Sequence, residues 1–119
     1  MYQADIPHAA RVCFSDLPQE EAEAWMRRFD RHSGQSYMDP LTHAGYVDIP
    51  VSWLFCEEDR VITPQMQRTA IEMIERDAGG QKVDVTSLKG PHIPHIRQEK
   101  EVVDWIVDAA RKVDKSSET

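Results

Sequence analysis

Hydrophobic residues are densest in the second half of the chain, where two short runs predict β-strands. Residues 51–56 (VSWLFC) are almost continuously apolar, which is typical of a strand covered on both faces. Residues 82–88 predict a second strand, with Val83 and Val85 on one face. The stretch between the two runs is long enough for a crossover helix, so we expect the strands to be parallel.

Helical patterns follow each predicted strand. Thr63-Pro64 predicts an N-cap followed by proline in the first turn, and Gly79-Gly80 predicts the end of that helix. The predicted order is strand, helix, strand, helix, with a right-handed crossover. The residues with helical spacing are Met66, Ala70, Met73 and Ile74 in the first helix and Val102, Val103, Ile106, Ala109, Ala110 and Val113 in the second.

The first half of the chain is predicted to be helical and irregular. One amphipathic helix is expected to begin near Pro18 and to end at Ser33-Gly34. Core packing explains its apolar stripe, and a ligand-facing role for Trp25 is the alternative. The polar residues 112–119 predict a frayed tail. The stripe consists of Ala22, Trp25, Met26 and Phe29.

Two strands are too few for an ordinary sheet, because five or six are usual. Residues 53–55 (WLF) resemble a central strand, which needs a neighbour on each edge and helices on both faces. The sequence supplies one neighbour, so the other edge would expose unpaired backbone groups beside large apolar side chains. We therefore expect part of the sheet to come from elsewhere, or not to form.

Composition and charge narrow the class of protein. The 119 residues include 14 Lys and Arg and 21 Asp and Glu, which gives a formal net charge of −7. This charge disfavours nucleic-acid and membrane partners, and no apolar run approaches the roughly 20 residues that span a bilayer. The start of the chain lacks the pattern of a signal peptide, and Cys13 and Cys56 lie among apolar neighbours like reduced thiols. We expect a cytoplasmic protein.

Candidate chemical groups follow both predicted strands. Residues 57–60 (EEDR) leave the first strand, and residues 89–92 (KGPH) leave the second. The carboxyl ends of adjacent parallel strands lie together, so a carboxylate from one loop can orient a histidine from the other. We favour Asp59 among the acids, with His92 as its partner. The alternatives are local capping around Thr63 for Asp59 and a bond to nearby backbone for His92.

These residues resemble a known family. Residues 48–51 (DIPV) through Cys56, the acids at 57–59 and Pro64 are similar to the penultimate strand and acid loop of the α/β-hydrolases. Gly90, His92 and Pro94, followed by residues 101–103 (EVV), resemble the histidine loop and last helix of that family. Residues 14–23 and 40–50 resemble the cap and linker of fungal-type serine hydrolases, which are esterase-like and often associated with secondary metabolism. The resemblance covers nearly all of this chain but only the C-terminal half of the family domain.

The resemblance implies an α/β fold that is the C-terminal portion of a hydrolase sheet. It divides the chain into a helical cap and linker remnant at 1–47, a β-α-β-α core at 48–113 and a frayed tail at 114–119. Asp59 would be the acid of a catalytic triad and His92 its general base, acting on a small-molecule ester or acyl substrate without a cofactor. Trp25, Met26 and Phe29 would line an apolar acyl pocket if the cap closed over the site.

The chain departs from the family pattern in two ways. Pro91 stands where the family usually has the glycine that precedes the histidine, and it restricts the backbone that aims His92. The nucleophile motif G-x-S-x-G is missing, as is the upstream oxyanion-hole loop. Residues 33–38 (SGQSYM) lack the last glycine, a preceding strand and a following helix, so Ser36 is not predicted to be a nucleophile.

Other chemistry is less well supported by the residues. His92 and His95 are three positions apart, and together with Asp59 they would make a metal site, but Pro94 lies between them and the three well-placed ligands of catalytic zinc are not evident. We therefore predict no metal and no cofactor.

Three hypotheses about function follow. The chain is part of an esterase-like serine hydrolase, inactive without the nucleophile half. Alternatively, it is a non-catalytic remnant that binds a partner or forms a homodimer through the exposed sheet edge, or a small enzyme that uses His92 and Asp59 alone.

Overall fold

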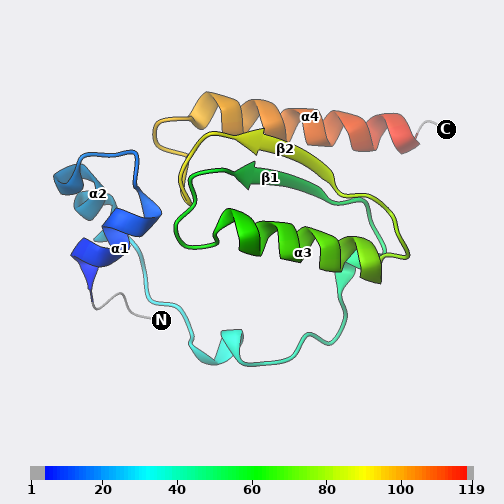
Figure 1. Ribbon diagram of the computed structural model, residues 1–119, viewed down its shortest axis with the longest axis horizontal. Helices are drawn as coiled ribbons and strands as arrows, with labels where there is room; N and C mark the ends of the chain where they lie inside the picture. Colours follow the sequence, from blue (N-terminus) through cyan, green and yellow to red (C-terminus); the bar gives the residue numbers. More distant parts are fainter. Residues whose placement is uncertain (1–4, 118–119) are drawn as a thin grey trace.

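The computed structural model describes residues 5–117 and contains α-helices, short 3-10 helices and two strands. Figure 1 shows their arrangement. In chain order the elements are α1 (Ile6–Cys13), α2 (Gln19–Met26), η1 (Gln35–Tyr37), η2 (Gly45–Val47), β1 (Ser52–Cys56), α3 (Pro64–Asp77), β2 (Asp84–Leu88) and α4 (Glu99–Ser117). The fold is therefore mixed α/β.

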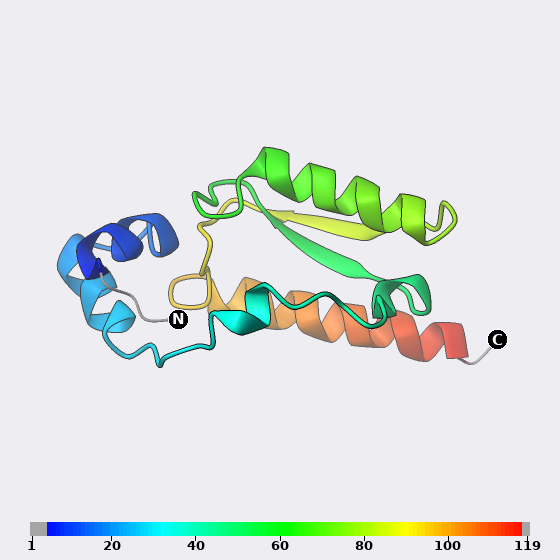
Figure 2. The same ribbon diagram turned by 90° about the horizontal axis from the view of Figure 1, so that it is seen from below.

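The two strands form a parallel pair between two helices. Trp53 lies opposite Val85, and Phe55 lies opposite Ser87. Figure 2 shows α3 on one face of the pair and α4 on the other. The guanidinium of Arg68 in α3 lies 5.9 Å from the ring centroid of Phe55. The predicted parallel order and the covering of β1 on both faces are confirmed.

Local sequence signals explain the limits of α3. The hydroxyl of Thr63 accepts a hydrogen bond from the backbone N–H of Met66, and Pro64 occupies the first helical position, where its missing N–H costs nothing. Gly79 and Gly80 have φ angles of 68° and 91°, a region that glycine enters without a steric penalty. Both predicted ends of this helix are confirmed.

The first half differs from the prediction. Helix α2 ends at Met26, not at Ser33-Gly34, because the backbone then tightens: Phe29 N–H donates to Met26 O at 3.1 Å. Phe29 turns away from the helical stripe and packs edge-on against Phe14, with ring centroids 6.1 Å apart. Helix α1 was not predicted, although Asp5 caps it by accepting from His8 N–H at 3.0 Å.

The C-terminal helix also extends further than predicted. Helix α4 continues to Ser117, so most of the segment predicted as a frayed tail is helical, and residues 118–119 lie outside the described part of the chain. The good helix formers Ala109, Ala110, Arg111 and Lys112 precede this segment, and the positive charge of Lys115 is favourable in the last turn.

The helices α1 and α2 form a small core at the carboxyl ends of the strands. Their contact buries Ala9, Ala10, Phe14, Ala22 and Met26, and Ile93 and Ile96 from the segment after β2 pack against it. Figure 1 shows both helices beyond the arrowheads of β1 and β2. The backbone N–H of Ile93 donates to Cys13 O at 3.0 Å, which ties this core to the loop that carries His92.

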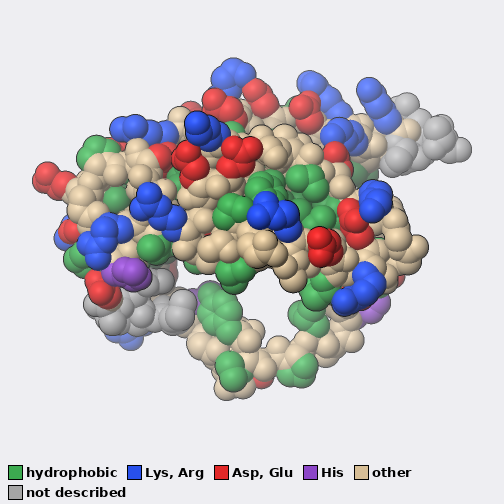
Figure 3. All heavy atoms as spheres, viewed as in Figure 1, with side chains coloured by type: hydrophobic (Ala, Val, Ile, Leu, Met, Phe, Trp, Pro, Cys, Tyr) green, Lys and Arg blue, Asp and Glu red, His purple; other side chains and the backbone are tan. Residues whose placement is uncertain are grey.

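The molecule is more extended than a compact chain of this length. Its radius of gyration is 16.4 Å, whereas about 13–14 Å is expected for a compact domain of this size. The stretch between α2 and β1 arches away from the body (Figure 3) and exposes Tyr37, Met38, Leu41 and Ile49. Among residues 5–117, no helix has the length and apolar character needed to cross a membrane.

Candidate acid–base site

Asp59 lies just beyond the end of β1, in a tight turn that leads to α3. Its side chain is 6% exposed. One carboxylate oxygen, Oδ1, accepts hydrogen bonds from the backbone N–H groups of Val61 and Ile62, both at 2.8 Å. These bonds stabilise the turn. Asp59 therefore has a local capping role, as the alternative prediction had it, but the donors are the N–H groups of Val61 and Ile62.

The other carboxylate oxygen meets His92. The Nδ1 atom of His92 lies 2.9 Å from Asp59 Oδ2, across 33 positions of sequence. The predicted contact between the two loops is therefore confirmed, and Asp59 serves the turn and the histidine with different oxygens. When Nδ1 carries the proton and donates it to the carboxylate, Nε2 keeps a lone pair on the opposite side of the ring. The His92 side chain is 32% exposed, so it remains accessible.

The loop around His92 is held from both sides, despite the proline that precedes the histidine. Pro91 is fully buried, and the side-chain amide of Gln98 donates to Lys89 O at 3.1 Å. A Cβ at position 90 would lie 2.2 Å from Oε1 of Gln98, so Gly90 leaves room for the present position of that side chain. Pro91 is thus compatible with a histidine that points at Asp59.

A hollow of about 850 Å³ opens beside His92. It is formed by the end of α1, the segment after α2, the turn of Asp59 and the loop of His92. Of the three residues expected to line an apolar pocket, Phe29 does so, while Met26 is buried in the core of α1 and α2 and Trp25 packs against that core. The lining residues are Cys13, Phe29, Asp30, Arg31, His32, Gly34, Tyr37, Val61, Ile62, His92 and Ile93.

Several of these lining residues could not be predicted from the sequence. Cys13 and Ile93 reach the hollow because α1 docks on the His92 loop. Val61 and Ile62 carried a local signal, since they are apolar residues in a turn between an acid and an N-cap. Neither lies in the interior of the molecule, with exposures of 36% and 37%, and both are available to a ligand.

The two cysteines are free thiols near Asp59. Burial raises the pKa of Cys13 and of Cys56, and the negative charge of Asp59 raises both pKa values further. Because the thiolate is the nucleophilic form, these residues are poor candidates for a catalytic nucleophile.

The remaining candidates do not join the site. The hydroxyl of Ser36 donates to Ser33 O at 2.7 Å within an exposed 3-10 turn. His43 pairs with Asp48, and His95 is exposed. Within residues 5–117 there is no group of three or more His, Cys, Asp or Glu that could hold a metal ion.

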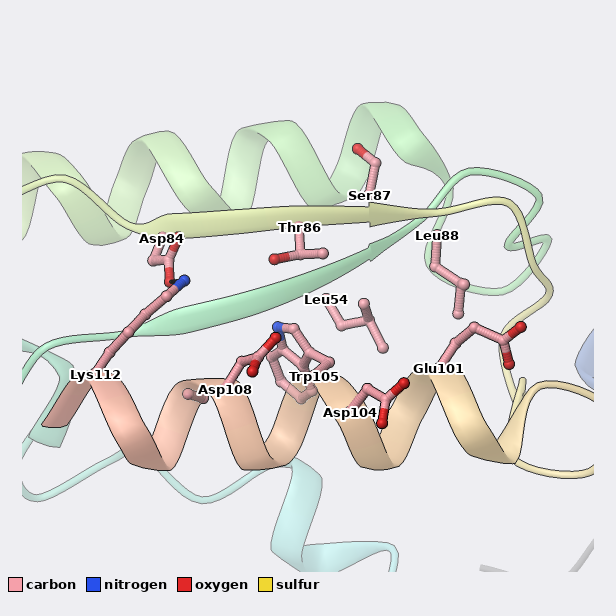
Figure 4. Close-up of a pocket in the computed structure, with 11 residues that line it drawn as sticks. Leu54, Asp84, Thr86, Ser87, Leu88, Glu101, Asp104, Trp105, Asp108 and Lys112 are labelled. Carbon is pink, nitrogen blue, oxygen red and sulfur yellow. Dashed lines mark hydrogen bonds and ion pairs between the residues drawn. The ribbon is translucent and has the colours of Figure 1, made fainter. Parts of the chain in front are cut away.

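A second hollow, of about 300 Å³, lies between the strands and α4 and is drawn in Figure 4. Leu54, Leu88 and Trp105 point into it, with acidic side chains from α4 around them. An ion pair between Lys112 and Asp84 closes one end. Neither Asp59 nor His92 lines this hollow, so it is separate from the acid–base pair.

Comparisons with known proteins relate the chain to a hydrolase-named protein. No protein-family model matches the chain. The chain is 38% identical, over 102 residues, to a protein of a Phoma species named "Probable hydrolase R7". The matched segment is 86% of this chain but 41% of that protein, so the chain spans about two fifths of the length of this relative.

Proposed function

We propose that this chain supplies the acid and the base of a serine hydrolase of the α/β-hydrolase type, which cleaves ester or acyl bonds. The observation that carries the proposal is the 2.9 Å contact between His92 Nδ1 and the buried carboxylate of Asp59, at the carboxyl ends of two adjacent parallel strands. The hydrolase name of the Phoma relative and the resemblance of both loops to that family support it.

The mechanism follows from the two ends of the imidazole ring. Nε2 of His92 would accept the proton of a serine hydroxyl as its oxygen attacks the acyl carbon, and it would then pass that proton to the leaving alcohol. A water molecule would be activated in the same way to release the acid. Asp59 would hold Nδ1–H throughout and stabilise the imidazolium that forms.

The serine must come from outside these 119 residues, since the sequence contains no G-x-S-x-G motif. The hollow beside His92 offers room for that serine and for the acyl group. Its wall around the histidine includes Phe29, Val61 and Ile93, which favours an apolar acyl group. A cytoplasmic location and a role in secondary metabolism remain predictions.

The test begins with the DNA upstream of Met1. We expect an in-frame G-x-S-x-G segment there, and we expect the longer protein to hydrolyse p-nitrophenyl esters. His92→Ala should lower kcat by at least about 10³-fold. His95→Ala is the matched control, because His95 is exposed three positions away, and it should retain activity. Absence of an upstream motif, or activity that survives His92→Ala, would refute the proposal.

A non-catalytic role is the second candidate, and the unpaired edge of β1 favours it. The described sheet contains β1 and β2 alone, so the outer edge of β1 is free to pair with a second copy of the chain. A monomer at all concentrations in sedimentation experiments would exclude such a homodimer.

A further inference from the structure

Gln67 is a buried amide that uses its entire hydrogen-bonding capacity on β1 and on the turn of Asp59 that follows it. It lies in α3 and is 3% exposed. Its Oε1 accepts from Cys56 N–H at 3.1 Å and from the indole N–H of Trp53 at 3.3 Å. Its Nε2 donates to Cys56 O and to Ile62 O, both at 2.9 Å. An amide has two donor hydrogens and two acceptor lone pairs, so no capacity is left over.

These bonds join the two ends of the turn that holds the carboxylate. Cys56 is the last residue of β1, and Ile62 immediately precedes the N-cap of α3. Asp59 lies between them in the sequence and accepts a hydrogen bond from Ile62 N–H, while Gln67 donates one to Ile62 O. Both peptide groups of Ile62 are therefore fixed, which fixes the direction in which Oδ2 points.

The bonds also explain how the turn leaves the strand. Glu57 N–H donates to Leu88 O at 2.9 Å, so Glu57 still faces β2. Alternate residues of a parallel strand face opposite sides, and the backbone groups of Cys56 therefore face away from β2. Gln67 satisfies both of them in the place where a further strand would otherwise bind.

We infer that Gln67 is a positioning residue for the Asp59–His92 pair: it closes the turn so that Oδ2 of Asp59 meets Nδ1 of His92. The catalytic meaning of this inference rests on the proposed function. The requirement is for an amide, because a carboxylate at position 67 would face Cys56 O and Ile62 O with no hydrogen to donate.

The inference can be tested in this chain by measuring the tautomer of His92, because that measurement does not require a nucleophile or any catalytic activity. Nitrogen-15 NMR of the neutral imidazole at alkaline pH distinguishes a proton on Nδ1 from one on Nε2. We expect the Nδ1–H form in the wild type. Gln67→Glu, and Gln67→Met, which removes the bonds without adding charge, should give a mixture with at least twofold less of that form.

Two controls separate positioning from general stability. Gln65→Glu makes the same chemical change at an exposed site of α3 and should leave the tautomer unchanged. Trp53→Phe removes one bond to Gln67 that does not involve the turn and should also leave it unchanged. Circular dichroism checks that each variant is folded. A folded Gln67→Met variant with the wild-type tautomer overturns the inference, and so does the loss of folding in both Gln67 variants.

The outcome is distinguishable from a failure of the proposed function. In the longer protein, Gln67→Met should lower kcat at least tenfold and leave KM within twofold, since Gln67 binds the two ends of the turn of Asp59 and does not line the substrate hollow. If the longer protein is inactive while the tautomer responds as expected, the proposed function fails and the positioning role stands. If the longer protein is active but the tautomer of His92 does not change in the Gln67 variants, the proposed function stands and the positioning role fails.

Discussion

At the scale of single residues, Asp59 has two separable tasks. Oδ1 accepts two backbone hydrogen bonds within its turn, and Oδ2 receives His92. A carboxylate in this position therefore stabilises the loop and selects the tautomer of the histidine at once. Because different oxygens are involved, substitutions can separate the two tasks.

We predict that Asp59→Asn keeps the turn and reverses the tautomer of His92. The asparagine oxygen can still accept from Val61 and Ile62, while its NH₂ group would donate to Nδ1 and leave the proton on Nε2. Asp59→Ala loses the turn as well and should be less stable than Asp59→Asn by about 1.5–3 kcal/mol. Urea denaturation measures the difference, and equal stability of the two variants would contradict the assignment of Oδ1.

We predict slow alkylation of Cys13 and Cys56. Burial first, and the charge of Asp59 second, raise the pKa of both thiols, so less thiolate exists at pH 8 than in the unfolded chain. Asp59→Asn removes the smaller cause and should speed the reaction with iodoacetamide partially, with the rate staying below that of the urea-unfolded protein. Rates equal to the unfolded protein before any substitution would show that neither thiol is protected.

The residue scale also shows what the sequence could reveal. Asp59 and His92 could be predicted because each lies in the loop that follows a predicted strand, and the ends of parallel strands lie together. Gln67 was missed because a glutamine in an amphipathic helix normally faces solvent. Its role depends on the packing of α3 against the end of β1, which brings Gln67 to the backbone of Cys56. No local sequence pattern encodes that tertiary contact.

At the scale of elements, the junction between α3 and β2 is held by Glu75. Its carboxylate accepts from Lys82 Nζ at 3.0 Å and from Val83 N–H at 3.1 Å. Hydrogen bonds from Lys82 and from the Val83 backbone lower the pKa of Glu75 below its usual value. A lowered carboxylate pKa stabilises the folded state above the pKa of the unfolded chain, and this stabilisation is lost as the pH falls through the folded pKa.

We therefore predict that Glu75→Gln lowers the Tm at pH 7 and that the difference from the wild type shrinks as the pH falls through the lowered pKa of the folded-state carboxylate, disappearing once that carboxylate is protonated. The glutamine can keep the bond from Val83 but has no charge for Lys82. Glu72→Gln is the matched control on an exposed part of the same helix. A Tm difference that persists unchanged at low pH would exclude the ionic contribution.

The elements of the second half were easier to predict than those of the first. Thr63-Pro64 and Gly79-Gly80 fix α3 by local geometry, so its ends were predicted closely. In the first half, Phe29 continued the helical spacing, yet its contact with Phe14 takes it out of the helix. An apolar residue at the helical spacing can belong to the helix, or it can lie in the turn after the helix and pack back against the same core. Periodicity is the same in both cases.

At the scale of the whole molecule, the sheet has two open edges with different character. Residues of β2 are mostly exposed and polar, as in a natural edge strand, whereas β1 carries Trp53, Leu54 and Phe55. Val51 O accepts from Asp84 N–H, so the alternate residues Ser52 and Leu54 present their backbone groups to the outer edge of β1. The side chain of Gln67 already binds the backbone N–H and C=O of Cys56. An added strand could therefore pair only with the part of β1 that precedes Cys56.

This asymmetry predicts which edge accepts a partner strand when the chain is studied alone. We expect its mean mass in sedimentation velocity to rise with concentration, because the outer edge of β1 pairs between copies. Ser52→Pro removes an outward N–H from β1 and should hold the chain as a monomer. Ser87→Pro is the matched control, since Ser87 lies opposite Phe55 and its N–H points outward from β2. If association persists in Ser52→Pro and is lost in Ser87→Pro, the copies pair through the outer edge of β2. The prediction that β1 is a central strand would then be wrong.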